Sequence, residues 1–220
     1  MFNWLFRKSS FYRFQDSYAF HSQAVANAIK NAIDARMDLD ETVVLLAHFP
    51  ERLNELEAML DRLELPFVIG TEPLDDSELL RIRGESSGRV ILTMAGMLSR
   101  TDQKPIRKDE PRVAVMVAER HPLPRYDQEI KLWSQWLPCP VQLGYFLSLD
   151  DPVVSFVIDD KVKQLLSHFG MGENELVTSN LVSRRVDRVL NRMAKNVFNE
   201  VACQSSAEWM GVNFPDSHSR

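Results

Sequence analysis

The stretch ERHPLPRYDQEIKLWSQWLPCPVQLGYFLSLDD, residues 119–151, decides the predicted fold. It begins with polar residues at the end of a predicted strand. From Pro124 to Trp136 its apolar residues then recur at the spacing of a helix. Pro138 and Pro140 stop that helix, because proline has no backbone donor with which to continue it. The apolar run Gln142–Ser148 then has the length of a buried strand. The stretch therefore predicts a strand end, a helix and a strand of one α/β sheet.

The same alternation is predicted upstream of this stretch. Strands are expected at Thr42–Phe49, Pro66–Gly70, Arg89–Thr93 and Arg112–Ala118, and helices at Glu51–Leu63 and Asp75–Arg83. A further helix is expected to begin at Asp16 or Ser17 and to run to about Arg36. Short crossovers between strands and helices predict a parallel sheet with helices on both faces. Ligands of such sheets bind at the carboxyl ends of the strands.

A helical region is predicted after Asp151. Its helices are expected at Pro152–Ile158, Asp160–Phe169 and about Ser179–Val201. The predicted organisation is an aromatic and basic arm over residues 1–15, an α/β domain over 16–151, a helical extension over 152–203 and a polar, frayed tail over 204–220. The arm suits either packing onto the domain, which its short length favours, or an interfacial membrane anchor.

Composition excludes several classes of protein. The net charge of −5 gives no overall attraction to nucleic acid. No run approaches the roughly 18 apolar residues of a spanning helix, and no signal peptide is visible. Cys139 and Cys203 form neither a metal-binding nor a disulfide pattern. We therefore expect a cytoplasmic protein without a metal site.

Short motifs at ordered spacings resemble the second motor domain of the preprotein translocase ATPase SecA over roughly residues 16–200. Glu119-Arg120-His121 resembles the family's E-R-H, and YFLSLDD at 145–151 resembles F-Y-L-S-M-E-D. TMAG at 93–96, DKV at 160–162 and FGM at 169–171 resemble T-N-M-A-G, D-R-V and L-G-M. The resemblance implies a RecA-like fold of the P-loop NTPase and helicase C-terminal type. The opening turns of the family's long scaffold helix would follow it.

The residues that carry ATP chemistry in that family are altered here. The 220 residues contain no G-x-x-x-x-G-K-[ST] phosphate loop. The family's arginine-rich Q-L-R-G-R-S-G-R aligns with EIKLWSQW at 129–136, which places Lys131, Trp133 and Trp136 at its arginine positions. Loss of an arginine finger costs about three to five orders of magnitude in rate. The resemblance therefore implies a degenerate ATPase domain with no catalytic residue.

A vestigial nucleotide face is expected at Arg100, Thr101, Asp102, Arg120 and Lys131. ATP or ADP would bind there only with a partner lobe, so no cofactor is expected for this chain alone. Trp133 and Trp136 fit either a core stripe or an apolar contact face for self-association. Arg184, Arg185, Arg188, Arg192 and Lys195 give the last long helix a basic face. That face suits solvent, or else anionic lipid or nucleic acid.

The leading functional hypothesis is a non-catalytic module of protein export that binds itself or a translocation component. The first alternative is half of a split ATPase, in which Lys131 and Arg120 are the surviving cations. The second alternative is a peripheral membrane adaptor that uses the aromatic arm.

Overall fold

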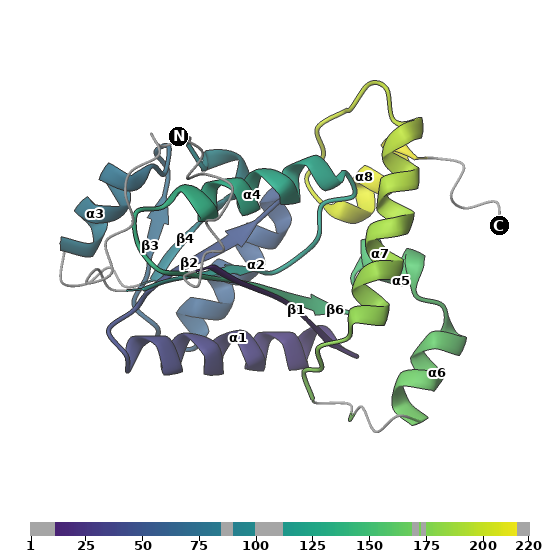
Figure 1. The fold of residues 1–220 in the computed structure, drawn as a ribbon, viewed down its shortest axis with the longest axis horizontal. Coiled ribbons are helices and arrows are strands. Elements are labelled where there is room, and N and C mark those ends of the chain that lie inside the picture. Colours follow the sequence, from purple (N-terminus) through teal and green to yellow (C-terminus); the bar gives the residue numbers. More distant parts are fainter. Residues whose placement is uncertain (1–11, 85–89, 100–111, 169–171, 173–174, 215–220) are drawn as a thin grey trace, which may run out of the picture.

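The computed structural model of the chain describes residues 12–84, 90–99, 112–168, 172 and 175–214 (Figure 1). One six-stranded parallel sheet runs through it in the order β1-β6-β5-β2-β4-β3. The strands are β1 (Tyr12–Ala19), β2 (Thr42–Ala47), β3 (Val68–Gly70), β4 (Val90–Met94), β5 (Val113–Val117) and β6 (Val141–Ser148). The predicted RecA-like α/β class is thereby confirmed.

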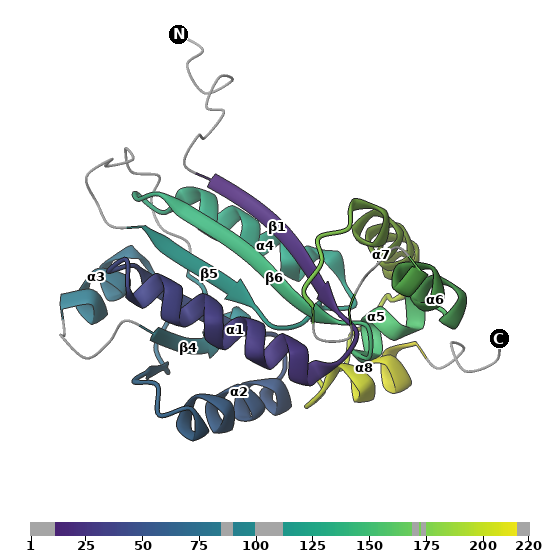
Figure 2. The same ribbon diagram turned by 90° about the horizontal axis from the view of Figure 1, so that it is seen from below.

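Helices cover both faces of the sheet (Figure 2). One face carries α1 (Ser22–Met37) and α2 (Pro50–Arg62), whose apolar sides share a core with β2, β4 and β5. The other face carries α3 (Asp76–Gly84) and α4 (Pro124–Trp136). The helices α5 (Pro152–Val157), α7 (Asn180–Met193) and α8 (Ser206–Asn213) share the same core and lie beyond the carboxyl ends of the strands (Figure 1). The described part also contains α6 (Asp160–His168) and two short 3-10 turns, η1 (Ala95–Met97) and η2 (Ala194–Asn196). None of the helices in the described ranges is long and apolar enough to cross a bilayer.

The central strands and the helix starts follow directly from the sequence. Every residue of β2 and of β5 is buried, as expected for apolar strands covered on both faces. Pro50, Pro124 and Pro152 begin α2, α4 and α5, at the first helical position, where a missing N–H costs nothing. Each of these helices starts just beyond the carboxyl end of a strand. We call this end of the sheet the carboxyl edge. The first turns of α2, α4 and α5 therefore lie around it.

The predicted helix start at Asp16 or Ser17 is wrong. Residues Tyr12–Ala19 form edge strand β1, which pairs in parallel with β6 from Tyr12↔Val141 to Ala19↔Ser148, and α1 begins only at Ser22. Aromatic residues favour a pleated, half-buried surface, and their alternation here outweighs the capping signal of Asp16. The predicted boundary between arm and domain at residues 15 and 16 thus falls inside a strand.

The predicted end of the long last helix is also wrong, because α7 ends at Met193 and η2 follows it. The chain then turns back toward the sheet, and residues 206–213 of the predicted frayed tail form α8. Trp209 and Met210 of α8 are buried in the core. We refer to residues 197–214 as the C-terminal segment.

Candidate functional site

Arg120, which follows β5, lies at the centre of a buried ionic cluster at the carboxyl edge. Its guanidinium donates to Asp127 Oδ2 of α4 at 2.8 Å and to Asp16 Oδ2 of β1 at 2.9 Å. It also donates to Asp187 Oδ1 of α7 at 3.2 Å and lies 4.6 Å from the centroid of the Tyr145 ring. The Arg120 side chain is only 2% exposed. These residues, the Arg120 cluster, join β1, α4, α7 and β6 through one cation.

The electrostatics of the Arg120 cluster favour the charged forms of Arg120 and Asp127. Burial by itself would raise the pKa of Asp127, but Arg120 and His48 beside it lower that pKa to about 2. His48 Nε2 lies 2.9 Å from Asp127 Oδ1, and both side chains are almost fully enclosed. Arg120 is therefore committed to carboxylates of its own chain. A nucleotide ligand would need the Arg120 guanidinium to be directed at solvent, and in this conformation it is enclosed.

The neighbouring motif residues also make contacts within the chain. Glu119 Oε1 accepts hydrogen bonds from the backbone N–H groups of His48 and Phe49, at 2.8 and 3.0 Å, and so holds the turn into α2. Burial raises the pKa of Glu119, and these bonds act against that rise. Arg52 of α2 binds Asp151 at 2.7 Å, and Asp151 also accepts from the N–H of Ser148. The residues that resemble E-R-H and F-Y-L-S-M-E-D thus tie helices to strand ends.

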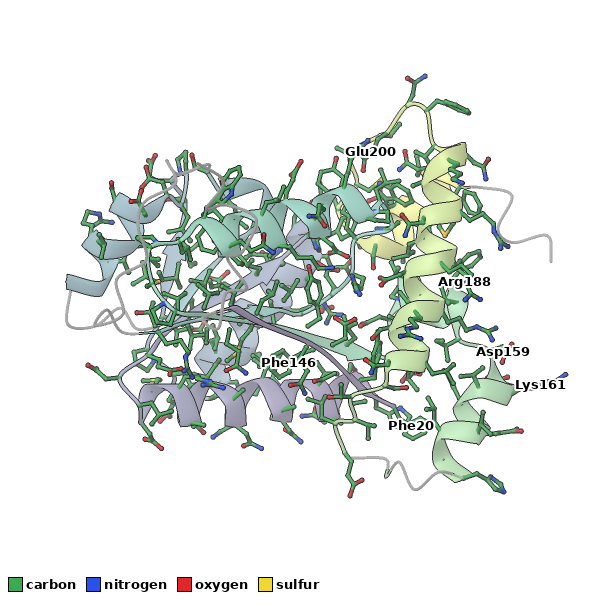
Figure 3. All side chains as sticks on the ribbon, viewed as in Figure 1. Phe20, Phe146, Asp159, Lys161, Arg188 and Glu200 are labelled. Carbon is green, nitrogen blue, oxygen red and sulfur yellow. The ribbon has the colours of Figure 1, made fainter. Side chains whose placement is uncertain are left out.

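His121 anchors the C-terminal segment over the carboxyl edge. Its ring stacks on Phe49 with centroids 5.1 Å apart, and it makes a T-shaped contact with the indole of Trp209, with centroids 5.7 Å apart. Glu200, labelled in Figure 3, accepts from Trp209 Nε1 at 2.8 Å and from the Tyr126 hydroxyl at 2.6 Å. Arg125 also donates to Glu200.

A backbone contact holds the C-terminal segment as well. The carbonyl of Gln204 accepts from the N–H of Glu51 at 3.0 Å. Side-chain and backbone contacts together fix the segment in place.

A cleft of about 440 Å³ lies between the C-terminal segment and the strand ends. Phe49, Met94 and Trp209 supply part of its apolar wall, and Glu129 and Glu200 supply its carboxylates. No lysine or arginine is among the described residues that line it. Arg125, close by, is paired with Glu200. In the described part of the chain, the cleft therefore offers an anionic phosphate little attraction.

The other predicted site residues that the structure describes are Lys131, Trp133 and Trp136, all on α4. Arg100, Thr101 and Asp102 lie outside the described residues. Lys131 is half-buried on α4 and does not line the cleft. Trp133 is buried, and its Nε1 donates to the carbonyl of Leu74 at 3.1 Å, so it belongs to the core, as its spacing also allowed.

Trp136 is less enclosed than Trp133. It is half-buried, and both tryptophans line a second cavity of about 240 Å³ with Leu98 and Glu129. Its predicted role in self-association stays a prediction.

Sequence reasoning missed Asp16, Glu200 and Trp209. The alternation Tyr12, Phe14, Asp16, Tyr18 indicates a strand that presents one carboxylate on its aromatic side. Ser205 and Glu208 have the spacing of a capping box, which predicts the start of α8, and the Ser205 hydroxyl does accept from the Glu208 N–H. Glu200 has no sequence signal of this kind. Among the described residues, no group of three or more His, Cys, Asp or Glu side chains could hold a metal ion.

His121 should make the folded chain sensitive to acid. Burial, assisted by His48, lowers its pKa to about 3, whereas an unfolded histidine titrates near 6.5. Between these values only the unfolded state takes up the proton, so falling pH favours unfolding. Relative to a His121→Phe variant, the wild type should lose up to about 1.4 kcal/mol of unfolding free energy per pH unit from about pH 6.5 toward 3. Urea unfolding at a series of pH values measures this difference. If the unfolding free energies of the two proteins change with pH in parallel, His121 has the same pKa in the folded and unfolded states, which would contradict this prediction.

The amino-acid sequence of the chain is similar to parts of SecA translocase subunits. No protein-family model matches the chain. The SecA translocase subunit of Parabacteroides distasonis is 26% identical over 124 residues, which cover 56% of this chain and 11% of that protein. That of Dichelobacter nodosus is 29% identical over 84 residues, covering 38% and 9%. That of Amoebophilus asiaticus is 22% identical over 122 residues, covering 55% and 11%. This chain contains a SecA-related domain.

The relation to SecA is distant and partial. The chain spans about a tenth of the length of the curated SecA subunits that it matches. Among solved structures, the C-terminal part of the Fun30 ATPase domain covers 76% of this chain and 53% of its own, with 14% identity and a TM-score of 0.38. The resemblance to SecA predicted from the motifs is confirmed, and the Arg120 cluster contains one residue from each of two of those motifs, Arg120 and Tyr145.

Proposed function

We propose that this chain is a SecA-related protein-export module that acts by binding a protein partner and does not itself hydrolyse ATP. One observation carries the proposal: the arginine of the E-R-H motif is enclosed by carboxylates at the edge where such sheets bind ligands. Phosphoryl transfer needs cations directed at the phosphates. Here the cation is paired with carboxylates of its own chain instead.

The C-terminal segment supports the same proposal. Trp209 and Glu200 hold it against His121 and Tyr126, so that part of the carboxyl edge is covered by the chain itself. A partner lobe that delivered a phosphate loop to this edge would have to displace these contacts. The relation to proteins named as translocase subunits supports a role in export. The activity of a whole SecA subunit does not follow from it, because so little of SecA is represented.

Isothermal titration with magnesium and ATP tests the proposal. We expect no binding heat at ATP concentrations up to the millimolar range typical of weak enzyme substrates, and no phosphate release above buffer. Lys131→Ala is the matched variant, because Lys131 is the cation that aligns with the family's arginine-rich motif. Phosphate release that is lost in Lys131→Ala would contradict the proposal and support the split ATPase. Release that is unchanged in Lys131→Ala would indicate a contaminating ATPase and would call for repurification.

A further inference from the structure

The outward face of α7 carries basic side chains in a line. The buried residues of this helix are Val182, Val186, Leu190 and Met193. On the opposite face are Arg184, Arg188 and Arg192, and Lys195 of η2 follows them; we call these four exposed residues the basic stripe. At about 100° per residue the three arginines fall within an arc of roughly 80°. In Figure 3, Arg188 lies on the side of α7 away from the sheet.

The charges of the basic stripe are not neutralised within the described part of the chain. No ion pair there joins any of the four to a carboxylate, whereas Arg185, the residue after Arg184, binds Asp159 at 3.3 Å and the Val157 carbonyl at 3.1 Å. The carboxylate of Asp187 is bound to Arg120. Like charges one helical turn apart destabilise a helix slightly, so an anionic partner along the stripe would relieve this repulsion.

Exposed apolar side chains stand at both ends of the basic stripe. Leu181, in the first turn of α7, is 66% exposed and falls within the same arc. Phe198 is 89% exposed and Val201 is 55% exposed, just beyond the other end of the helix. Phenylalanine and arginine are enriched at protein interfaces relative to the rest of the protein surface. The face therefore combines a row of cations with an apolar anchor at each end.

We propose that this face binds an acidic helical segment of a partner protein, with carboxylates spaced about one turn apart and apolar residues near both ends. The inference deepens the proposed function by naming the chemistry of the partner. The stripe from Arg184 to Lys195 extends over roughly 17 Å at 1.5 Å per residue, which matches about three turns of a partner helix. Arginine forms paired hydrogen bonds with a carboxylate, so three arginines favour such a partner over a diffuse charged surface.

Two other anionic partners fit less well. A helix that lies on a membrane inserts its apolar face, but the apolar face of α7 is buried in the core. A protein that binds nucleic acid usually has a basic domain, whereas this chain has a net charge of −5. The membrane and the nucleic acid therefore enter the experiment as competing outcomes.

The experiment measures binding of a labelled synthetic peptide by fluorescence anisotropy at low salt. The peptide is a helix of about four turns with glutamates one turn apart and leucines near both ends. We expect saturable binding that weakens by at least tenfold in Arg188→Glu and weakens as salt rises. Arg62→Glu is the matched control, since Arg62 is an exposed arginine of α2, outside the stripe. Phe198→Ser should also weaken binding, because it removes one apolar anchor.

Several results would overturn the inference. They are equal binding by Arg188→Glu and Arg62→Glu, no binding of the peptide, or tighter binding to anionic phospholipid vesicles or to a single-stranded oligonucleotide than to the peptide. Arg188 and Phe198 are both exposed, so circular dichroism should show both variants folded. The ATP titration has a separate readout. If the peptide does not bind, the proposal that the chain does not hydrolyse ATP is unaffected. If ATP binds, the peptide-binding result for the basic stripe is unaffected.

Discussion

Replacing Arg120 with alanine is expected to destabilise the folded chain by about 3 to 5 kcal/mol, the cost of removing one partner from a buried ion pair. Asp16 and Asp127 would remain buried without their cation, since each is only 3% exposed. The measurement is the free energy of unfolding from urea titration at neutral pH. Lys30→Ala is the control, because it breaks the half-exposed Lys30–Asp34 pair, for which we expect a cost of less than about 1 kcal/mol.

The effect of Arg120→Ala should depend on pH in a defined direction. In the wild type the folded-state pKa of Asp127 is lowered to about 2 from its ordinary 3.8. A lowered carboxyl pKa adds stability that is present above about pH 3.8 and is lost as pH falls through about 2. The difference in unfolding free energy between the wild type and Arg120→Ala should therefore become smaller as pH falls from about 3.8 to about 2. An Arg120→Ala protein as stable as the wild type at neutral pH would show that the cluster contributes nothing net to folding.

Replacing Trp209 with alanine is expected to cost about 3 to 5 kcal/mol, the usual range for truncating a large core aromatic residue. Trp209 is 1% exposed, packs against His121 and donates to Glu200. Because its contacts hold the C-terminal segment, the loss should appear first as faster amide exchange in α8. Val212→Ala is the control on the same helix, since Val212 is 49% exposed and should change stability by less than about 1 kcal/mol. Unchanged amide exchange in Trp209→Ala would contradict the proposed anchoring of this segment.

The central α/β architecture was predictable because it depends on local signals. Apolar runs identify β2 and β5, and prolines at both ends set the bounds of α4, which match the prediction. Strand β1 was missed although its aromatic alternation was present, because the same rings also suited an arm. Helix α8 was missed because its capping box was interpreted as part of a polar tail.

The arrangement of the site was not predictable from local signals. The partners of Arg120 include Asp16 and Asp187, which are 104 and 67 residues away along the chain. Such pairing depends on the parallel register of β1 with β6 and on the packing of α7 at the carboxyl edge. The E-R-H motif at 119–121 therefore helped to predict the family of the domain. The contacts of Arg120 became known only from the structure.

Amide hydrogen exchange with and without magnesium and ATP tests the central claim most directly. That claim is that the carboxyl edge is occupied by contacts within the chain. The account predicts identical exchange at residues 94–99, 119–129 and 199–209, with or without the nucleotide. Protection of these segments by ATP, lost again when Lys131 is replaced by alanine, would contradict it.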